Sequence, residues 1–389
     1  ARPAKVGSQK DFSGGGLSLK IFGNSTRHRT PQPHRNRIPN LLMHLALCAF
    51  EDIVHGKVLQ TRRLSGGEIA IFDRVDKFME HAAPMLFYGN PAPDAELVVM
   101  YGNCQIPFLA RLLAAAHGDK GFLCVLNHAP PGEEPDRPTP EQMQRCCLYL
   151  EQYDSQFDLA AWGVPPEVER YGLPLCRYLR EHCPPGCPTV AFPSFVMTCM
   201  WPFAVTSDPR NVPEPDYVWG RYPYGNRVAL EVVASGLRGA QALAAYQQRS
   251  AAQMPDLATL LARAQRKLLL RDAQCDVKIG DYVWDNFRER HLFLAYAHVR
   301  AEAIGELARR LLTAVQPVLG GHADAAWRRL NTAIDAMPDM DVMEEPIEPA
   351  VAQGLGLKFY EPDMRFRWFD QRWTFVEYIR HYLDYDTSW

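Results

Sequence analysis

Four consecutive residues, Gly102-Asn103-Cys104-Gln105, place a thiol between an apolar run and a segment with helical spacing. Amides at a helix N-terminus lack partners within the helix, and this end carries roughly half a positive charge. Such a setting can lower the pKa of a thiol from about 8.5, and its N–H groups can hold an oxyanion or a phosphate. Cys104 is therefore a candidate nucleophile, and Gly102, Asn103 and Gln105 are candidate oxyanion or cofactor-binding residues.

Two histidines also follow apolar runs. His128 comes directly after 121–127, and His298 comes shortly after 291–296. Either imidazole can serve as the general base of an acyl transfer that uses the thiol. The alternative for Cys104 is a packing role, because cysteine is among the residue types most often buried. For each histidine the alternative is a hydrogen bond or a cap within the core.

The elements that must position these side chains alternate between strands and helices. Runs of strand length lie at 96–101, 121–127, 157–162, 189–192 and 291–296. The alternation favours a parallel sheet with helices on both faces. We predict a helix-rich α/β fold, a flavodoxin- or SGNH-like three-layer core with about five short parallel strands. Ligands bind at the carboxyl ends of such strands, and these ends carry Cys104, His128, Gly163, Ser194 and His298.

Several helix starts are marked by particular residues. Pro107 suits the first turn of a helix over about 104–117, where a missing N–H does no harm. Thr139, followed by Pro140 and Gln142, has the pattern of a capping box. Thr374 and Glu377 repeat that pattern near the end of the chain, and Asp256 is the predicted cap of a further helix.

Composition changes along the chain predict its division into parts. Residues 1–37 are expected to form a flexible basic arm, interpreted as a solvated tail, with contact to a phosphate-rich partner as the alternative. Residues 38–94 are expected to be an N-terminal helical extension. The α/β core with its C-terminal helices is placed at 95–194 and 291–389. Residues 195–290 are expected to be an aromatic loop and a helical insertion lobe.

Charge and composition exclude several classes of protein. The 42 Lys and Arg against 45 Asp and Glu give a net charge of −3, which argues against nucleic-acid binding. The 47% apolar and 22% charged residues are typical of a soluble globular chain. No run has the length of a membrane span or the pattern of a signal peptide. Ten scattered cysteines fit reduced thiols, so a cytoplasmic location is expected.

Four of the cysteines are close together in pairs. Cys183 and Cys187 are separated by the three residues of a Pro-Pro-Gly loop, with no second pair at metal-ligand spacing. The interpretation is a loop with two free thiols rather than a metal site. Cys146 and Cys147 are predicted to be packing residues of a helix, because adjacent cysteines rarely form a disulfide. No metal is expected.

This arrangement of residues resembles that of two families. A nucleophile after the first strand and a late histidine resemble SGNH/GDSL-type hydrolases and acyltransferases, although cysteine replaces their serine and Asp-x-x-His is missing before His298. The chain is more similar to the WcbI-type family of bacterial capsular polysaccharide biosynthesis proteins. That resemblance covers about 95–389 and rests on Gly102-Asn103-Cys104-Gln105, on Arg290–His298 and on Trp373–Arg380. Members commonly have His-Pro where this chain has His298-Val299.

The resemblance implies binding of coenzyme A or acetyl-CoA and O-acetylation of a capsule sugar. Arg111 and Arg227, and also Arg221, Arg288 and Arg300, are then candidates to meet the phosphates of coenzyme A, with a solvated surface role as the alternative. Trp201, Tyr222 and Tyr224 are candidates to line the cleft for the sugar, with packing of a proline-rich loop as the alternative.

These observations lead to one expected function and two rivals. The expected function is an acyl-CoA-dependent O-acetyltransferase in which His298 or His128 is the base. Cys104 would either carry the acyl group transiently or lie beside the bound thioester. The rivals are a cysteine-dependent esterase or thioesterase of SGNH type and a non-catalytic carbohydrate- or nucleotide-binding protein.

Overall fold

A computed structural model describes residues 85–129, 135–153, 173–205, 208–214, 220–340 and 343–385. All of these residues belong to one compact unit, Asn40–Trp389. The predicted basic arm, the predicted strand 157–162 and Gly163 lie outside the described residues, as does the predicted N-terminal extension up to residue 84.

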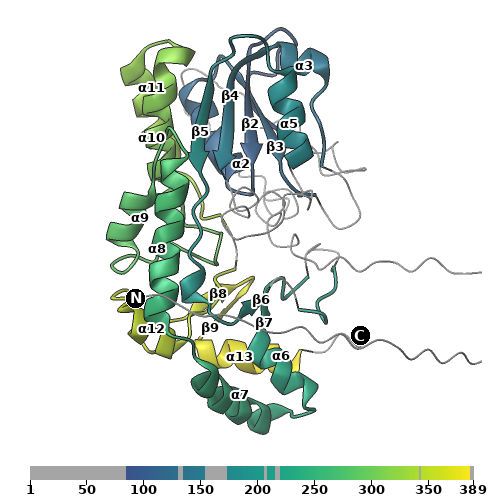
Figure 1. Cartoon of the computed structure of the whole chain (residues 1–389), viewed down its shortest axis with the longest axis vertical. Coiled ribbons are helices and arrows are strands. Elements are labelled where there is room, and N and C mark those ends of the chain that lie inside the picture. Colours follow the sequence, from purple (N-terminus) through teal and green to yellow (C-terminus); the bar gives the residue numbers. More distant parts are fainter. Residues whose placement is uncertain are drawn as a thin grey trace, which may run out of the picture. The chain divides into compact units, whose positions relative to one another are not determined.

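The largest sheet of the described part has five strands in the order β1-β3-β2-β4-β5, and it occupies the upper half of the view in Figure 1. Its strands are β1 (Leu86–Gly89), β2 (Leu97–Gly102), β3 (Gly121–Leu126), β4 (Cys146–Tyr153) and β5 (Thr189–Pro193). Strands β2 to β5 are parallel, whereas β1 pairs antiparallel with β3 at one edge. β2 is buried along its whole length, as expected for a strand covered on both faces. The predicted α/β class is confirmed.

Helices cover both faces of this sheet. On one face, α2 (Ile106–Ala116) packs with α10 (Ala301–Leu319) and α11 (Ala323–Asp335). On the other face, α3 (Pro140–Gln144) and α5 (Leu173–His182) share a separate apolar cluster with the strands. Figure 1 shows α10 and α11 on one side of the strands and α3 and α5 on the other. The described residues therefore form the predicted three layers.

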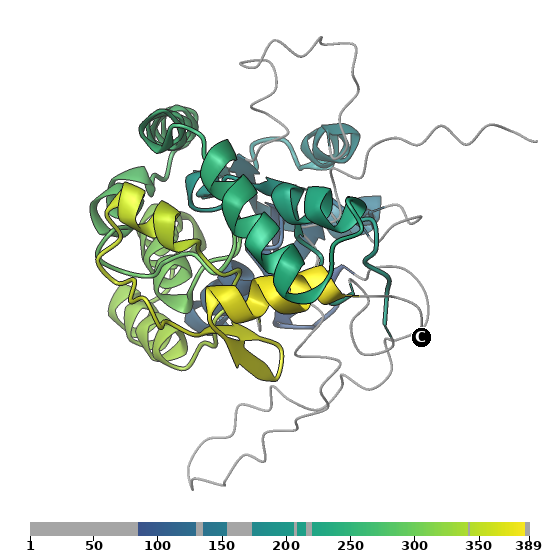
Figure 2. The ribbon, with the colours of Figure 1, turned by 90° about the horizontal axis from the view of Figure 1, so that it is seen from below.

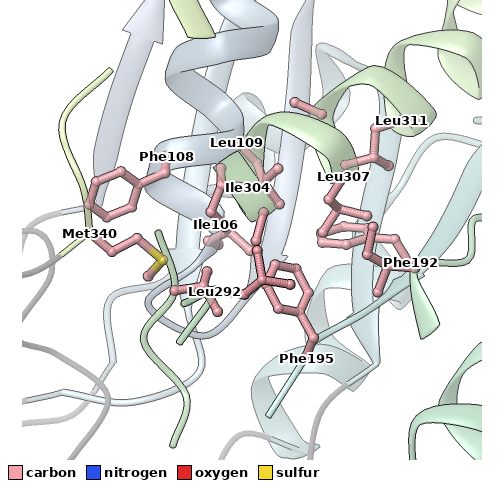
Figure 3. Packing of buried hydrophobic residues seen from close by; sticks show 14 of the residues in the cluster. Ile106, Phe108, Leu109, Phe192, Phe195, Leu292, Ile304, Leu307, Leu311 and Met340 are labelled. Carbon is pink, nitrogen blue, oxygen red and sulfur yellow. The ribbon is translucent and has the colours of Figure 1, made fainter. Parts of the chain in front are cut away.

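The contact between α2 and α10 holds the start of α2 in place. Ile106 and Leu109 of α2 lie against Ile304 and Leu307 of α10 (Figure 3). All four side chains are fully buried. Burying one such side chain stabilises a fold by about 1.5–3 kcal/mol. Because Ile106 begins the helix, this packing also positions the turn that contains Cys104.

The chain after β5 is mostly helical, as predicted. It contains η3 (Thr198–Met200), β6 (Ala204–Val205), β7 (Gly225–Asn226), α6 (Arg227–Ala234), α7 (Gly239–Gln253), α8 (Leu257–Ala273) and α9 (Gly280–Asn286). After α11 come α12 (Pro349–Leu355), β8 (Phe366–Trp368), β9 (Gln371–Trp373) and α13 (Phe375–Asp384). α13 packs against α6 and α7 in a second apolar cluster (Figure 2). The β8–β9 hairpin was not predicted, because three-residue strands leave almost no pattern.

The predicted helix starts are confirmed. Thr139 and Gln142 form a capping box at α3, and Thr374 and Glu377 form one at α13. The Asp256 carboxylate accepts hydrogen bonds from two amides at the start of α8. These caps depend on residues at most three positions apart, so the sequence alone specifies them.

The prediction that Cys146 and Cys147 lie on a helix is wrong. α3 ends at Gln144, and Cys146 begins β4. The register between β2 and β4 shifts at this point, which is a β-bulge. The bulge interrupts the alternation of side chains, and β4 is covered on both faces. The sequence therefore lacks the two-residue period that identifies a strand.

The predicted fifth parallel strand at 291–296 is also wrong. Residues Leu292 to Ala295 are fully buried, but they pair with none of the sheet strands that the structure describes. Instead the chain folds back on itself: Phe293 and Val299 form an isolated antiparallel bridge, and the Leu294 amide donates to the His298 carbonyl at 2.8 Å. The fifth strand is β1, which precedes residue 95, the predicted start of the core.

Candidate active site

The turn between β2 and α2 lies at a switch point of the sheet. The connection that leaves β2 passes over the α2 face, whereas the connection from β4 to β5 includes α5 on the opposite face. Neighbouring parallel strands whose connections leave in opposite directions open a crevice at their carboxyl ends. Asn103, Cys104 and Gln105 follow β2 at this edge, and Gln152 lies near the end of β4.

Gly102 is required here for space. An added Cβ would lie 2.5 Å from Oε1 of Gln152 and 2.7 Å from Cγ2 of Ile106. The backbone of Gly102 is outside the left-handed region, so a sharp turn does not require glycine at this position. Glycine is required because its neighbours leave no room for a side chain. Gln152 can therefore reach the turn only because residue 102 has no side chain.

Hydrogen bonds within the protein engage the amides of this turn. The Asn103 amide donates to Oε1 of Gln152 at 2.8 Å, and the Gln105 amide donates to Oδ1 of Asn103 at 3.0 Å. The Ile106 amide donates to the Asn103 carbonyl at 3.1 Å. An oxyanion bound at any of these three amides would have to replace an existing hydrogen bond.

Gln105 joins three other segments to the turn. Its side chain is fully buried. Nε2 donates to the carbonyls of Phe195 and Ala297, both at 2.9 Å, and Oε1 accepts from Nε2 of Gln152 at 3.0 Å. The residues before His298, the residues after β5 and the end of β4 are thereby held against the turn that carries Cys104.

His128 is held next to the same turn. The Asn127 amide donates to the Gly102 carbonyl at 2.8 Å, which fixes the end of β3 beside the end of β2. Nδ1 of His128 lies 2.8 Å from Oδ1 of Asn127. An amide oxygen only accepts, so Nδ1 carries the proton in this arrangement. The imidazole is 1% exposed.

His298 reaches the site from the folded-back loop rather than from a strand. The residue before it, Ala297, is bonded to Gln105, and the Tyr224 hydroxyl lies 2.9 Å from Nδ1 of His298. Both His298 and Cys104 are buried, at 0% and 1% exposure. Hydrogen bonds thus hold the segments that carry His128 and His298 against the turn of Cys104, and all three residues are buried.

The family model of the polysaccharide biosynthesis enzyme WcbI matches residues 97–317, more than half of the chain. This chain belongs to the WcbI family. A solved structure of WcbI, the native protein without a disulfide bond between coenzyme A and one of its cysteines, is similar to it with a TM-score of 0.51. The two chains are 16% identical, and the similarity covers 75% of this chain and 89% of the other. No curated protein matches the sequence.

The match to the WcbI family includes most of the residues described above. Cys104, Gln105, His128, Gln152 and His298 all lie within 97–317. Among the described residues, no helix combines the length and the apolar character that a membrane span needs.

The predicted aromatic residues of the sugar cleft are largely packed inside this WcbI-family chain. Tyr222 is 4% exposed and stacks on Trp368 with ring centroids 5.6 Å apart. Tyr224 is 1% exposed and bonds His298. Nε1 of Trp201 donates to the Glu345 carbonyl at 2.9 Å, and Trp201 lines a cavity of about one water molecule beside Glu345.

The two arginines first proposed for the cofactor lie on different helices, Arg111 on α2 and Arg227 on α6. Arg111 is exposed on α2. Arg227 pairs with Glu231 at 2.9 Å and also contacts Gln253. Arg221 and Arg300 bind carboxylates as well. Both Arg111 and Arg227 are exposed, but Arg111 is the one on the helix that begins at the turn.

Sequence reasoning missed Gln152 and Glu345. Gln152 is a polar residue at the end of an apolar run, and it would have been noticed if 146–153 had been recognised as a strand. Glu345 lies in an irregular acidic stretch and gave no signal. It is buried, its Oε2 atom has no hydrogen-bond partner among the described residues, and burial raises its pKa to about 8. The nearby His298 imidazole opposes that rise.

The raised pKa of Glu345 predicts a specific dependence of stability on pH. An unfolded glutamate releases its proton near pH 4.3, whereas folded Glu345 keeps its proton up to about pH 8. The folded state therefore binds more protons between these values, and stability falls as pH rises, by up to about 1.4 kcal/mol per pH unit. Glu345→Gln is expected to remove this slope in urea unfolding measured from pH 5 to pH 8.5. The control, Glu361→Gln at an exposed carboxyl, should keep it. If the free energy of unfolding of Glu345→Gln and of the wild type changed in parallel with pH, the raised pKa of Glu345 would be contradicted.

Proposed function

We propose that this WcbI-family member is an acyl-CoA-dependent O-acetyltransferase that acts on a sugar hydroxyl of a bacterial capsular or surface polysaccharide. The observation that carries the proposal is the Gln105 network, because it joins the Cys104 turn at the start of α2 to the loop that presents His298. Family membership supports the sugar acceptor. The solved WcbI structure, which is described by the absence of a disulfide bond between coenzyme A and a cysteine, supports an acyl-CoA as the acetyl donor.

In the proposed reaction Cys104 and His298 have distinct roles. The Cys104 sulfur attacks the carbonyl carbon of the acetyl thioester, the bond to coenzyme A breaks, and coenzyme A leaves with the proton of Cys104. His298 then removes the proton of the sugar hydroxyl as its oxygen attacks the acetyl carbon. Cys104 leaves as a thiolate and recovers that proton from His298. The product is the sugar O-acetyl ester, and His128 is the second candidate base.

A direct route uses the same residues without a covalent step. Cys104 then lies beside the acetyl thioester of coenzyme A, and the sugar oxygen attacks that thioester while His298 takes the proton. Arg111 is the proposed contact for the phosphates, because it is exposed one turn into α2. We favour the covalent route, because thiol–thioester exchange costs almost no free energy.

Thermal unfolding in the presence of ligands tests the donor. Coenzyme A at 100 times its dissociation constant is expected to raise the free energy of unfolding by about 2.7 kcal/mol. ADP and ATP at the same concentrations are the controls for binding through the nucleotide alone. If neither coenzyme A nor any acyl-CoA shifts the transition, the donor assignment is wrong.

Mass spectrometry after addition of acetyl-CoA separates the routes and the rivals. The covalent route predicts an acetyl adduct on the wild type and none on Cys104→Ser, whereas Cys147→Ser should form it as the wild type does. Release of free acetate at the same rate with and without a sugar acceptor would favour a thioesterase instead.

A further inference from the structure

Three cysteines gather at the opposite end of β4 from the candidate active site. Cys146 is the first residue of β4, and Cys183 and Cys187 lie in the loop between α5 and β5. Their three sulfur atoms all lie within 4.8 Å of one another. All three are free thiols. Cys146 was not grouped with Cys183 and Cys187 from the sequence, because it was predicted to lie on a helix.

The spacing of these sulfurs suits a single cation. A zinc–sulfur bond is about 2.3 Å, so two thiolates at tetrahedral angles around one zinc ion are about 3.8 Å apart. The sulfurs of Cys146 and Cys187 are 3.7 Å apart. A disulfide would require about 2.05 Å, so this pair is unbonded. One sulfur–sulfur distance therefore already matches shared coordination, and the other two are at most 4.8 Å.

The loop is shaped to bring Cys187 back toward Cys183. The Cys187 amide donates to the Pro184 carbonyl at 3.0 Å, which closes a four-residue turn. Gly186, the third residue of the turn, has φ of +81°, a conformation that favours glycine. Pro185 before it suits the second position of such a turn. The Cys-Pro-Pro-Gly-Cys sequence therefore holds the two thiols in place.

The surroundings leave access for a fourth ligand. Cys146 is 5% exposed, whereas Cys183 and Cys187 are half-buried. Solvent can thus reach one side of the cluster and supply water as the fourth ligand.

We propose that Cys146, Cys183 and Cys187 bind one thiophilic divalent cation of the zinc class. Binding replaces the thiol protons: three thiols and M²⁺ give a three-thiolate complex of charge −1 and three protons. The cation would tie the start of β4 to the loop before β5, at the edge of the sheet away from Cys104. The site is independent of the proposed acetyl transfer.

Cadmium titration of the full chain tests this site. The protein is reduced with a phosphine, treated with a chelator and titrated with Cd²⁺ while the cadmium–thiolate absorption in the ultraviolet is recorded. The expected result is saturation at about one Cd²⁺ per chain, with release of about two to three protons at neutral pH. Competition with Zn²⁺ should remove the absorption.

Neighbouring cysteines provide matched variants. Cys187→Ser, which changes a half-buried loop residue, is expected to abolish the one-equivalent site, and Cys183→Ser should do the same. Cys147→Ser is the control, because Cys147 packs against the other face of the sheet. Equal loss in Cys147→Ser and Cys187→Ser would overturn the proposal. It would also be overturned if the reduced protein bound no Cd²⁺ and the air-exposed protein carried a disulfide between two of the three.

Discussion

Replacing His298 with alanine is expected to lower kcat for acetyl transfer about one hundred- to ten-thousand-fold, the usual contribution of a positioned general base. The imidazole is fully buried and is held by the Tyr224 hydroxyl at 2.9 Å, so no bulk base can take its place. The measurement is the initial rate of sugar O-acetylation with saturating acetyl-CoA and acceptor.

A second variant separates chemistry from folding. His298→Gln keeps a polar side chain that can still bond the Tyr224 hydroxyl, but it cannot accept a proton at neutral pH. We expect it to unfold at a temperature near that of the wild type and to lose as much kcat as His298→Ala. Tyr224→Phe removes only the hydroxyl and should cost much less. A His298→Gln variant with kcat within threefold of the wild type would show that His298 is not the base.

Gln105→Glu is expected to lower the free energy of unfolding by about 2–5 kcal/mol at pH 7. The change preserves the shape of the side chain but replaces its donor with an oxygen that faces the carbonyls of Phe195 and Ala297. Each buried carbonyl left without a donor costs about 1–3 kcal/mol, and a buried carboxylate adds its own desolvation. Urea unfolding of both proteins measures the difference.

The pH dependence of that loss has a defined sign. Burial beside two carbonyl oxygens should raise the pKa of Glu at position 105 above its unfolded value of about 4.3. The folded variant then binds more protons than the unfolded variant. Its free energy of unfolding therefore falls further below that of the wild type as pH rises above about 4. Gln142→Glu is the control, because glutamate serves equally well in the capping box of α3. If both variants had wild-type stability, the Gln105 network would not contribute to folding.

The sequence predicted the turn and its flanking elements because the signals there are local. An apolar run, Gly102 and Pro107 lie within a dozen residues, and the structure has β2 and α2 where they indicate. The three helix caps are confirmed for the same reason.

Strand β4 and the loop before His298 were mispredicted for opposite reasons. In β4 a bulge and burial on both faces hide the strand period. In 291–296 the apolar run looks like a strand, but its backbone partners are in its own loop and in distant segments, such as Glu345 and Met197. Burial selects apolar residues in both cases, and only the tertiary partner decides whether the backbone joins a sheet.

The sequence placed Cys104, His128, Ser194 and His298 after predicted strands. For His298 that strand was wrong, because the chain before it folds back as a loop. The bonds that hold the site join Gln105 to residues 47, 90 and 192 positions away in sequence. No local pattern records such pairs. The chemical roles of Cys104, His128 and His298 stay predictions for the experiments above.

The long reach of Gln105 also sets an order of events during synthesis. Residue 297 is made about 10–40 s after Gln105 at the usual 5–20 residues per second, since 192 residues separate the two. Until then the nascent chain contains Cys104 but lacks the carbonyl that fastens its turn. A chain that stops short of residue 297 therefore carries the thiol without the arrangement that surrounds it, and completion of the polypeptide becomes a condition for assembly of the site.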